Sequence, residues 1–134
     1  MAALSDVREA LQARLKTIPG LRASDVGIAT PTPPQASVNL RSFTYAQDYD
    51  DSVLWVFDVW IYVNSADIER GQRALDAYLA PSGEQSVKVA LEDDQHLGGL
   101  SDWVRVVGAL QGPSQPEISG MKVLTIALQV EVMA

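Results

Sequence analysis

The chain has 134 residues, of which 47% are hydrophobic and 20% are charged, and its formal net charge is −7. This length and composition suit one globular domain with a single core and exclude a long disordered chain. The acidic balance disfavours phosphate neutralisation, so we expect no sequence-specific nucleic-acid binding. The absence of cysteine excludes disulfides, thiolate metal sites and a cysteine nucleophile.

The N-terminal third predicts one helix and two strands. Residues 5–17 carry an apolar stripe at helical spacing, with Ser5 as a candidate N-cap and Pro19-Gly20 as the stop. This opening lacks the basic region and cleavage-like site of a signal peptide. A short strand is expected over 26–29, followed by the stiff connector 31–34. A second strand is expected over 36–45, with inward side chains from Val38, Leu40 and Phe43.

Residues 53–63, VLWVFDVWIYV, form the most apolar run of the chain, and the other elements are expected to organise around it. The run is shorter than the roughly 18–20 apolar residues that cross a bilayer, so no membrane association is expected. Its β-branched and aromatic content predicts a strand with both faces covered. Helices would lie on one face, and more sheet, loops or a neighbouring subunit would lie on the other. A short loop connects this strand to the strand over 36–45, which favours an antiparallel hairpin.

The second half of the chain predicts two helices and then two strands. A helix is expected over about 66–80, capped by Asn64 or Ser65, and a shorter one over about 84–91. A glycine turn at 98–99, a strand over 103–110, a loop over 112–120 and a last strand over 121–133 follow. The order α-β-β-β-α-α-β-β predicts a single α+β domain over residues 1–134. We expect a mostly antiparallel sheet of about four to five strands with helices on one face.

Few residues suggest chemistry. Asp58 lies inside the apolar strand and needs a partner, for which Arg41 and Arg105 are candidates. The single histidine, His96, has no recognisable set of metal ligands around it and is expected on a surface loop. The three tryptophans are expected in the core, with a role as interface anchors as the alternative. No catalytic signature is present, so the chain is not expected to be an enzyme and needs no cofactor.

The stretch 72–106, QRALDAYLAPSGEQSVKVALEDDQHLGGLSDWVRV, resembles a segment of small proteins from tailed bacteriophages that infect actinobacteria. In those proteins a helix ending in LDAYL leads through PSG to a short helix, an LGG turn and a strand with an Arg-Val pair. The corresponding positions here are 75–79, 81–83, 86–91, 97–99 and 105–106. The opening LSDVREALQARLKTIPGLR and the closing VEV of the last strand are similar as well.

These relatives are usually assigned as tail terminators of long-tailed, siphovirus-type phages, or more loosely as head–tail joining or neck proteins. The resemblance implies a virion protein that forms a homo-oligomeric ring, typically a hexamer, on the head-proximal end of the tail tube. Such a ring stops polymerisation of the tube protein and offers a docking surface to the head-side connector. Its partners would be copies of itself, the major tail tube protein and that connector.

Two loops are the candidate interaction surfaces, because loops are exposed. The first candidates lie in the loop 46–52, whose carboxylates could also bind a divalent cation such as magnesium; the others lie in the loop 112–120. The candidate residues are Asp48, Asp50, Asp51, Pro113, Gln115 and Glu117. Two alternatives remain open: another neck component or minor tail protein that attaches to the connector, and a small ligand-binding or enzymatic module that uses Asp58.

Overall fold

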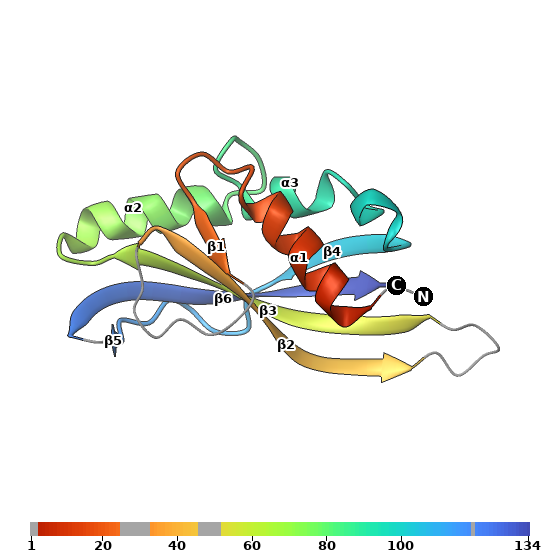
Figure 1. The fold of residues 1–134 in the computed structure, drawn as a ribbon. Coiled ribbons are helices and arrows are strands. Elements are labelled where there is room, and N and C mark those ends of the chain that lie inside the picture. Colours follow the sequence, from red (N-terminus) through yellow and green to blue (C-terminus); the bar gives the residue numbers. More distant parts are fainter. Residues whose placement is uncertain (1–2, 25–32, 46–51, 119) are drawn as a thin grey trace.

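The computed structural model describes residues 3–24, 33–45, 52–118 and 120–134. In this part of the chain, helices lie on one face of a mostly antiparallel sheet, which confirms the expected α+β class (Figure 1). In chain order the elements are α1 (Leu4–Leu15), β1 (Arg22–Ser24), β2 (Gln35–Tyr45), β3 (Val53–Asn64), α2 (Ile68–Leu79), α3 (Val87–Glu92), the 3-10 turn η1 (Leu97–Gly99), β4 (Trp103–Gly108), β5 (Glu117–Ile118) and β6 (Met121–Met133).

The two longest strands, β3 and β6, form the centre of the sheet. Across the sheet the order is β1-β2-β3-β6-β4, and β5 adds to the first residues of β6. All these pairs are antiparallel except β1 with β2. The predicted hairpin of β2 and β3 is confirmed, with Gln35 opposite Tyr62 and Tyr45 opposite Val53.

The alternation of β3 separates a helix face from an open face. The helix-facing side chains are all buried, as the apolar run predicts: Val53, Trp55, Phe57, Val59, Ile61 and Val63. On the opposite side of the strand, Leu54, Val56, Asp58 and Trp60 are only half-buried. Tyr62, further along the same side, is buried. The expectation that both faces are covered is therefore right for the helix face and, on the other side, right only at Tyr62. We call the other side the open face.

The predicted helices exist, but their first residues differ from the prediction. The N-cap of α1 is Ala3, which gives no side-chain hydrogen bond, so Ser5 is not the cap. Asp67 caps α2 by accepting the Arg70 N–H at 3.2 Å, whereas Asn64 accepts the N–H of Ala66 in the turn before the helix. Both candidate caps, Asn64 and Ser65, are therefore wrong. Short polar side chains also stabilise turns, and so sequence alone does not distinguish a turn from a cap.

Two other segments differ from the expectation. The predicted strand over 26–29 lies outside the described residues, and β1 instead begins at Arg22 and pairs parallel to β2 through Ser37. The predicted loop over 112–120 contains β5 and an isolated bridge between Ser114 and Thr125. None of the helices in the described part of the chain is long and apolar enough to cross a membrane.

Candidate functional site

A β-bulge in β2 directs Arg41 to the open face. Leu40 pairs with Phe57, and the next paired residue, Ser42, lies opposite Val56, so Arg41 is the extra residue between them. The bulge leaves two consecutive residues of β2 on the open face and restores the alternation afterwards. A local irregularity of the strand therefore positions the only arginine of β2.

Arg41 is the partner of Asp58, one of the two arginines expected from the sequence. Its Nε lies 3.2 Å from Asp58 Oδ2, and its Nη1 donates to Gln129 Oε1 over 3.3 Å. The other candidate, Arg105, faces Glu131 at 4.0 Å. The Arg41 and Asp58 side chains are 39% and 20% exposed, so solvent screens this pair and its contribution to stability is about 1 kcal/mol or less.

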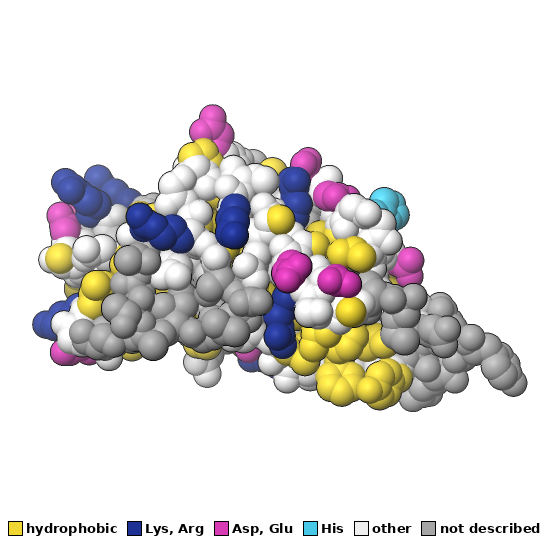
Figure 2. Space-filling model, in the orientation of Figure 1, with side chains coloured by type: hydrophobic (Ala, Val, Ile, Leu, Met, Phe, Trp, Pro, Cys, Tyr) yellow, Lys and Arg dark blue, Asp and Glu magenta, His cyan; other side chains and the backbone are white. Residues whose placement is uncertain are grey.

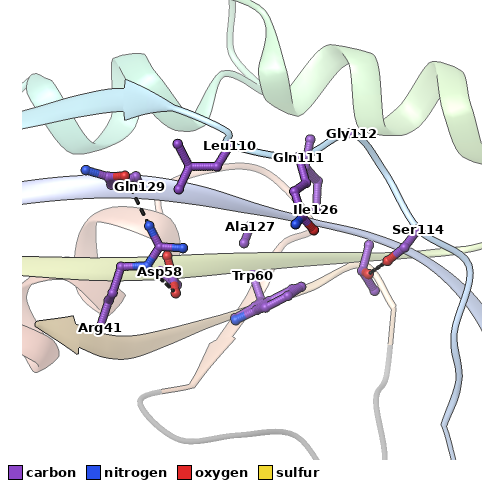
Figure 3. A pocket seen from close by; sticks show the side chains of 11 residues that line it. Arg41, Asp58, Trp60, Leu110, Gln111, Gly112, Ser114, Ile126, Ala127 and Gln129 are labelled. Carbon is purple, nitrogen blue, oxygen red and sulfur yellow. Dashed lines mark hydrogen bonds and ion pairs between the residues drawn. The ribbon is translucent and has the colours of Figure 1, made fainter.

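A cavity of about 260 Å³ lies beside this ion pair on the open face (Figure 3). It exists because the chain bows away from β6: Gly108 pairs with Gln129 and Ser114 with Thr125, so residues 109–113 span the gap opposite 126–128. Trp60 and the ion pair lie on one side of the cavity, and the bowed segment lies on the other. Leu110, at the mouth, is 72% exposed.

The lining of this open-face cavity offers hydrogen bonds and an aromatic surface. Its hydroxyls belong to Ser114 and Thr125, whose oxygens lie 3.1 Å apart and bond to each other. No histidine lies among the described lining residues, and the one carboxylate of the lining, Asp58, is paired with Arg41. The arrangement can hold a small polar ligand, but the lining provides no recognisable catalytic pair.

The residues considered for metal binding do not come together. His96 is exposed, and its Nδ1 lies 3.1 Å from the Ser101 carbonyl oxygen. The Asp94 carboxylate accepts hydrogen bonds from the backbone N–H groups of His96 and Gly98. Asp94 therefore stabilises the turn that follows it. Within the described ranges, no three His, Asp or Glu side chains are grouped so as to hold a metal ion.

The six candidate interaction residues fall into two groups. Asp48, Asp50 and Asp51 lie outside the described residues. Pro113, Gln115 and Glu117 are exposed, the last of them in β5. Of the tryptophans, Trp55 is in the core as expected, whereas Trp60 is half-buried on the open face and Trp103 is half-buried at the start of β4.

Two side chains occupy the outer edge of β4. Gln95 Oε1 accepts the Val104 N–H at 3.0 Å, and Glu92 Oε2 accepts the Val106 N–H at 2.8 Å. In an antiparallel strand, alternate residues point their N–H groups away from the partner strand, and these are the donors that an added strand would need. An additional strand would therefore have to displace both side chains.

The environment of Glu92 favours its charged form. Burial raises the pKa of the Glu92 carboxyl, but the hydrogen bonds from Lys88 and Val106 and the charges of Lys88 and Arg105 outweigh burial and hold this pKa below its usual value. Lys88 Nζ lies 2.8 Å from both carboxylate oxygens. At neutral pH the β4 edge is thus closed by an ionised acceptor.

The opposite edge of the sheet has no such protection in the described part of the chain. There, β1 pairs with β2 only as far as Ser37, and no described strand lies outside residues 38–45. Phe43 and Tyr45 are 46% and 68% exposed, and they share the helix face because they lie opposite Trp55 and Val53. Hydrophobic side chains gather over this end of β2 (Figure 2). We call Phe43 and Tyr45 the β2 aromatic patch.

A second cavity, of about 190 Å³, lies at the β4 edge on the helix face. We call it the β4 cavity. Val107 is 44% exposed at this place because the pairing of β4 with β6 is irregular between Val106 and Gly108. Its lining is mainly apolar and includes Tyr78, Leu79, Lys88, Val106, Val107 and Leu128. Burial raises the pKa of the Tyr78 hydroxyl, which is therefore neutral at physiological pH.

The chain matches no protein-family model and no curated protein.

The exposed aromatic residues of β2 and the side chains that close the β4 edge are not predicted from the sequence, for identifiable reasons. The sequence predicts an inward Phe43, and this side chain does share the helix face, but it lies beyond the core and is 46% exposed. The repeat of aromatic residues at 43 and 45 is the one sign in the sequence of an apolar surface that continues past the core. Nothing in the sequence associates Glu92 and Gln95 with the edge of β4.

Proposed function

We propose that this chain is the subunit of a ring that caps the head-proximal end of a phage tail tube. The observation that carries the proposal is a pair of unlike apolar surfaces, the β2 aromatic patch and the β4 cavity, on opposite edges of one sheet. Cyclic head-to-tail assemblies need two different complementary surfaces on each subunit. The resemblance of residues 72–106 to tail terminators supplies the identity of the ring.

Other features are consistent with a structural subunit. The open face of the sheet is only half-buried over β3 from Leu54 to Trp60, which leaves a surface for contact with a tube or with another ring. The net charge of −7 keeps a protein with exposed apolar side chains soluble before it meets its partners. Together these features support a protein that acts by assembly.

The test has two stages. Light scattering after size exclusion, over a range of protein concentrations, should give a discrete ring near six subunits, and negative-stain microscopy should display rings. The purified major tail tube protein of the same phage is then polymerised with and without this chain. Shorter tubes with the chain bound at one end are expected. Tubes of unchanged length without bound chain would contradict the proposal, whatever the mass of the free protein.

The same two stages separate the alternatives. Binding to the purified head-side connector without binding to tubes would identify a different neck component. Repeating the scattering measurement with magnesium examines the carboxylates Asp48, Asp50 and Asp51: a mass that depends on magnesium in the natural chain, but not in a variant with all three changed to Asn, would assign them a cation.

The open-face cavity favours one other candidate function, a small ligand-binding module. This candidate predicts a monomer or dimer whose melting temperature rises with a monosaccharide, nucleoside or amino acid from a screening panel. The rise should disappear in Asp58→Asn, which loses the charge next to the cavity. A panel without any shift removes this candidate.

A further inference from the structure

We propose that the open-face cavity beside Arg41 and Asp58 binds one neutral sugar residue. Trp60 would pack against one face of the sugar ring, and the hydroxyl groups of the ring would bond to polar groups around the cavity. This site is independent of the proposed ring. It gives the open-face cavity a chemical class of ligand, which its volume alone does not.

The strand β6 has an unpaired section that faces the cavity. Thr125 donates its N–H to Ser114 and accepts the Ser114 N–H, so the backbone groups of Thr125 point away from β3. Alternate residues of a strand point the same way, so the N–H and C=O of Ala127 point toward the bowed segment 109–113. No described residue bonds to them there. Backbone groups in such a place pair with water or with a ligand, and Ala127 lines the cavity.

A large side chain lies between two small ones in the row that crosses this part of the open face. Trp60 has Ser37 as its partner on β2 and Ala127 as its partner on β6. The small methyl group of Ala127 leaves space next to Trp60, which is half-buried and is the one aromatic side chain of the described lining (Figure 3). The C–H groups on one face of a sugar ring are apolar, and the negative face of an aromatic ring attracts them.

Polar side chains lie on both sides of this row. Thr125 and Gln129 are two residues before and after Ala127, about 7 Å from it along β6, and both line the cavity. The hydroxyls of Thr125 and Ser114 bond to each other, which leaves one hydrogen of the pair to donate. Arg41 bonds to Oε1 of Gln129, so the amide nitrogen of Gln129 remains a donor. Sugar hydroxyls both donate and accept, and they radiate from the ring toward both sides.

The charges at the cavity favour a neutral ligand. Arg41 and Asp58 are the charged residues of the described lining, and their side chains lie 3.2 Å apart as an ion pair. A charged ligand would be attracted by one member of this pair and repelled by the other. The net charge of −7 disfavours anions further. A phosphate or carboxylate ligand therefore fits this cavity less well than an uncharged polyol.

The size of the cavity limits the ligand to one ring. An apolar cavity of about 150 Å³ holds benzene, and the open-face cavity measures about 260 Å³, which gives room for a six-membered ring with its hydroxyls. The pairs on either side of the unpaired section, Thr125 with Ser114 and Gln129 with Gly108, stop an extended peptide from continuing along β6. A second sugar residue would lie outside, in solvent.

Saturation-transfer difference NMR on the full chain tests the site, with glucose, galactose, mannose and N-acetylglucosamine as neutral probes. At least one probe should receive saturation, and titration calorimetry with that sugar should give one site per chain. Glucose 6-phosphate and glucuronate are the charged probes, and each should bind about tenfold or more weakly than the best neutral sugar. Binding of no neutral probe at its solubility limit overturns the inference, and so does tighter binding of a charged one.

Two substitutions change the cavity in different ways. Trp60→Leu removes the flat aromatic surface but keeps an apolar side chain, and it should weaken binding about tenfold or more. Trp60→Phe keeps an aromatic ring and should retain part of the affinity. Ala127→Leu fills the space next to Trp60 and should abolish binding. Far-UV circular dichroism establishes that each variant is folded before it is compared.

Trp103→Leu is the matched control. Trp103 is also half-buried on the open face, in the row of Leu54 and Met133, but it does not line this cavity. This variant should bind the sugar as the natural chain does. Equal losses in Trp60→Leu and Trp103→Leu overturn the inference, and so does unchanged affinity in folded Trp60→Leu or Ala127→Leu.

A last comparison separates the two sources of such a ligand and the two proposals. A free monosaccharide enclosed by the cavity should bind less well as its methyl glycoside, whereas the end of a glycan chain should bind equally well as a methyl glycoside or a disaccharide; either result supports a sugar site. Light scattering on the same samples reports on the ring. Loss of sugar binding in Trp60→Leu at unchanged mass leaves the ring intact, and sugar binding by a chain that neither forms rings nor caps tubes refutes the proposed function alone.

Discussion

Gly71 is a residue whose importance is visible only in three dimensions. It lies inside α2, where glycine is about 1 kcal/mol less favourable than alanine. A Cβ at this position would lie 2.7 Å from the carbonyl oxygen of Asn64, a backbone atom at the end of β3 that cannot easily move. The absence of a side chain is what allows α2 to approach the sheet.

Gly71→Ala should therefore destabilise the protein, by about 1–3 kcal/mol as overpacking usually does, despite the better helix propensity of alanine. Urea unfolding measures the change. Gly112→Ala is the matched control: nothing lies within 4 Å of its Cβ position, and the expected change is within about 0.5 kcal/mol. A stabilised Gly71→Ala variant would mean that α2 does not pack against Asn64.

Glu92 provides a prediction about pH. Its pKa in the folded protein lies below the usual value, so in the window beneath about pH 4.5 the unfolded chain binds more protons than the folded one. The stabilisation is complete above this window and is lost as pH falls through the folded pKa. Glu92→Gln should lower the free energy of unfolding by about 1 kcal/mol at pH 7, and the difference should shrink as pH falls through the folded pKa of Glu92. A difference that stays constant with pH would contradict this role.

At the scale of elements, side chains cover the outer N–H groups of β4 but not those of β2 in the described part of the chain, and substitution can remove this cover from β4. Glu92→Ala with Gln95→Ala frees the N–H groups of Val104 and Val106 at the β4 edge. Unprotected edges pair with other chains, so the double variant should aggregate at concentrations at which the natural chain gives constant light scattering. Glu84→Ala with Gln85→Ala, in the turn before α3, changes the same residue types away from the edge and should have no effect.

Elements were predictable where the cause of their formation is local. The alternation of 53–63 and the helical stripe of 5–17 depend on near neighbours, and both predicted elements exist. The caps depend on how the chain leaves β3, and so Asp67 rather than Asn64 or Ser65 begins α2. Of the contacts between distant residues, the pairing of Asp58 with Arg41 was among those expected, because both lie on strands predicted to form a hairpin. The bond from Val106 to Glu92, which joins a strand to a helix, was not predictable, nor was the cavity beside Asp58, which depends on a segment that bows away from β6.

For the whole molecule, charge and assembly oppose each other. Each chain carries a formal charge of −7, so copies in a ring repel one another, and salt screens this repulsion with a Debye length of about 10 Å at 0.1 M. An assembly held by apolar side chains should therefore become stronger as sodium chloride is raised from about 0.05 to 0.5 M. Sedimentation velocity at fixed protein concentration measures this. Dissociation at high salt would instead indicate a contact made by ion pairs.

The position of β6 in the chain has a consequence for folding during translation. This strand pairs with β3, β4 and β5, yet it follows all of them in the sequence. While the chain is being translated, the hydrophobic faces of α1, β2 and β3 emerge long before the strand that completes their sheet. The nascent chain therefore passes through a stage in which apolar strands are exposed and chaperones can bind them. The sheet reaches its native topology only after β6 has left the ribosome.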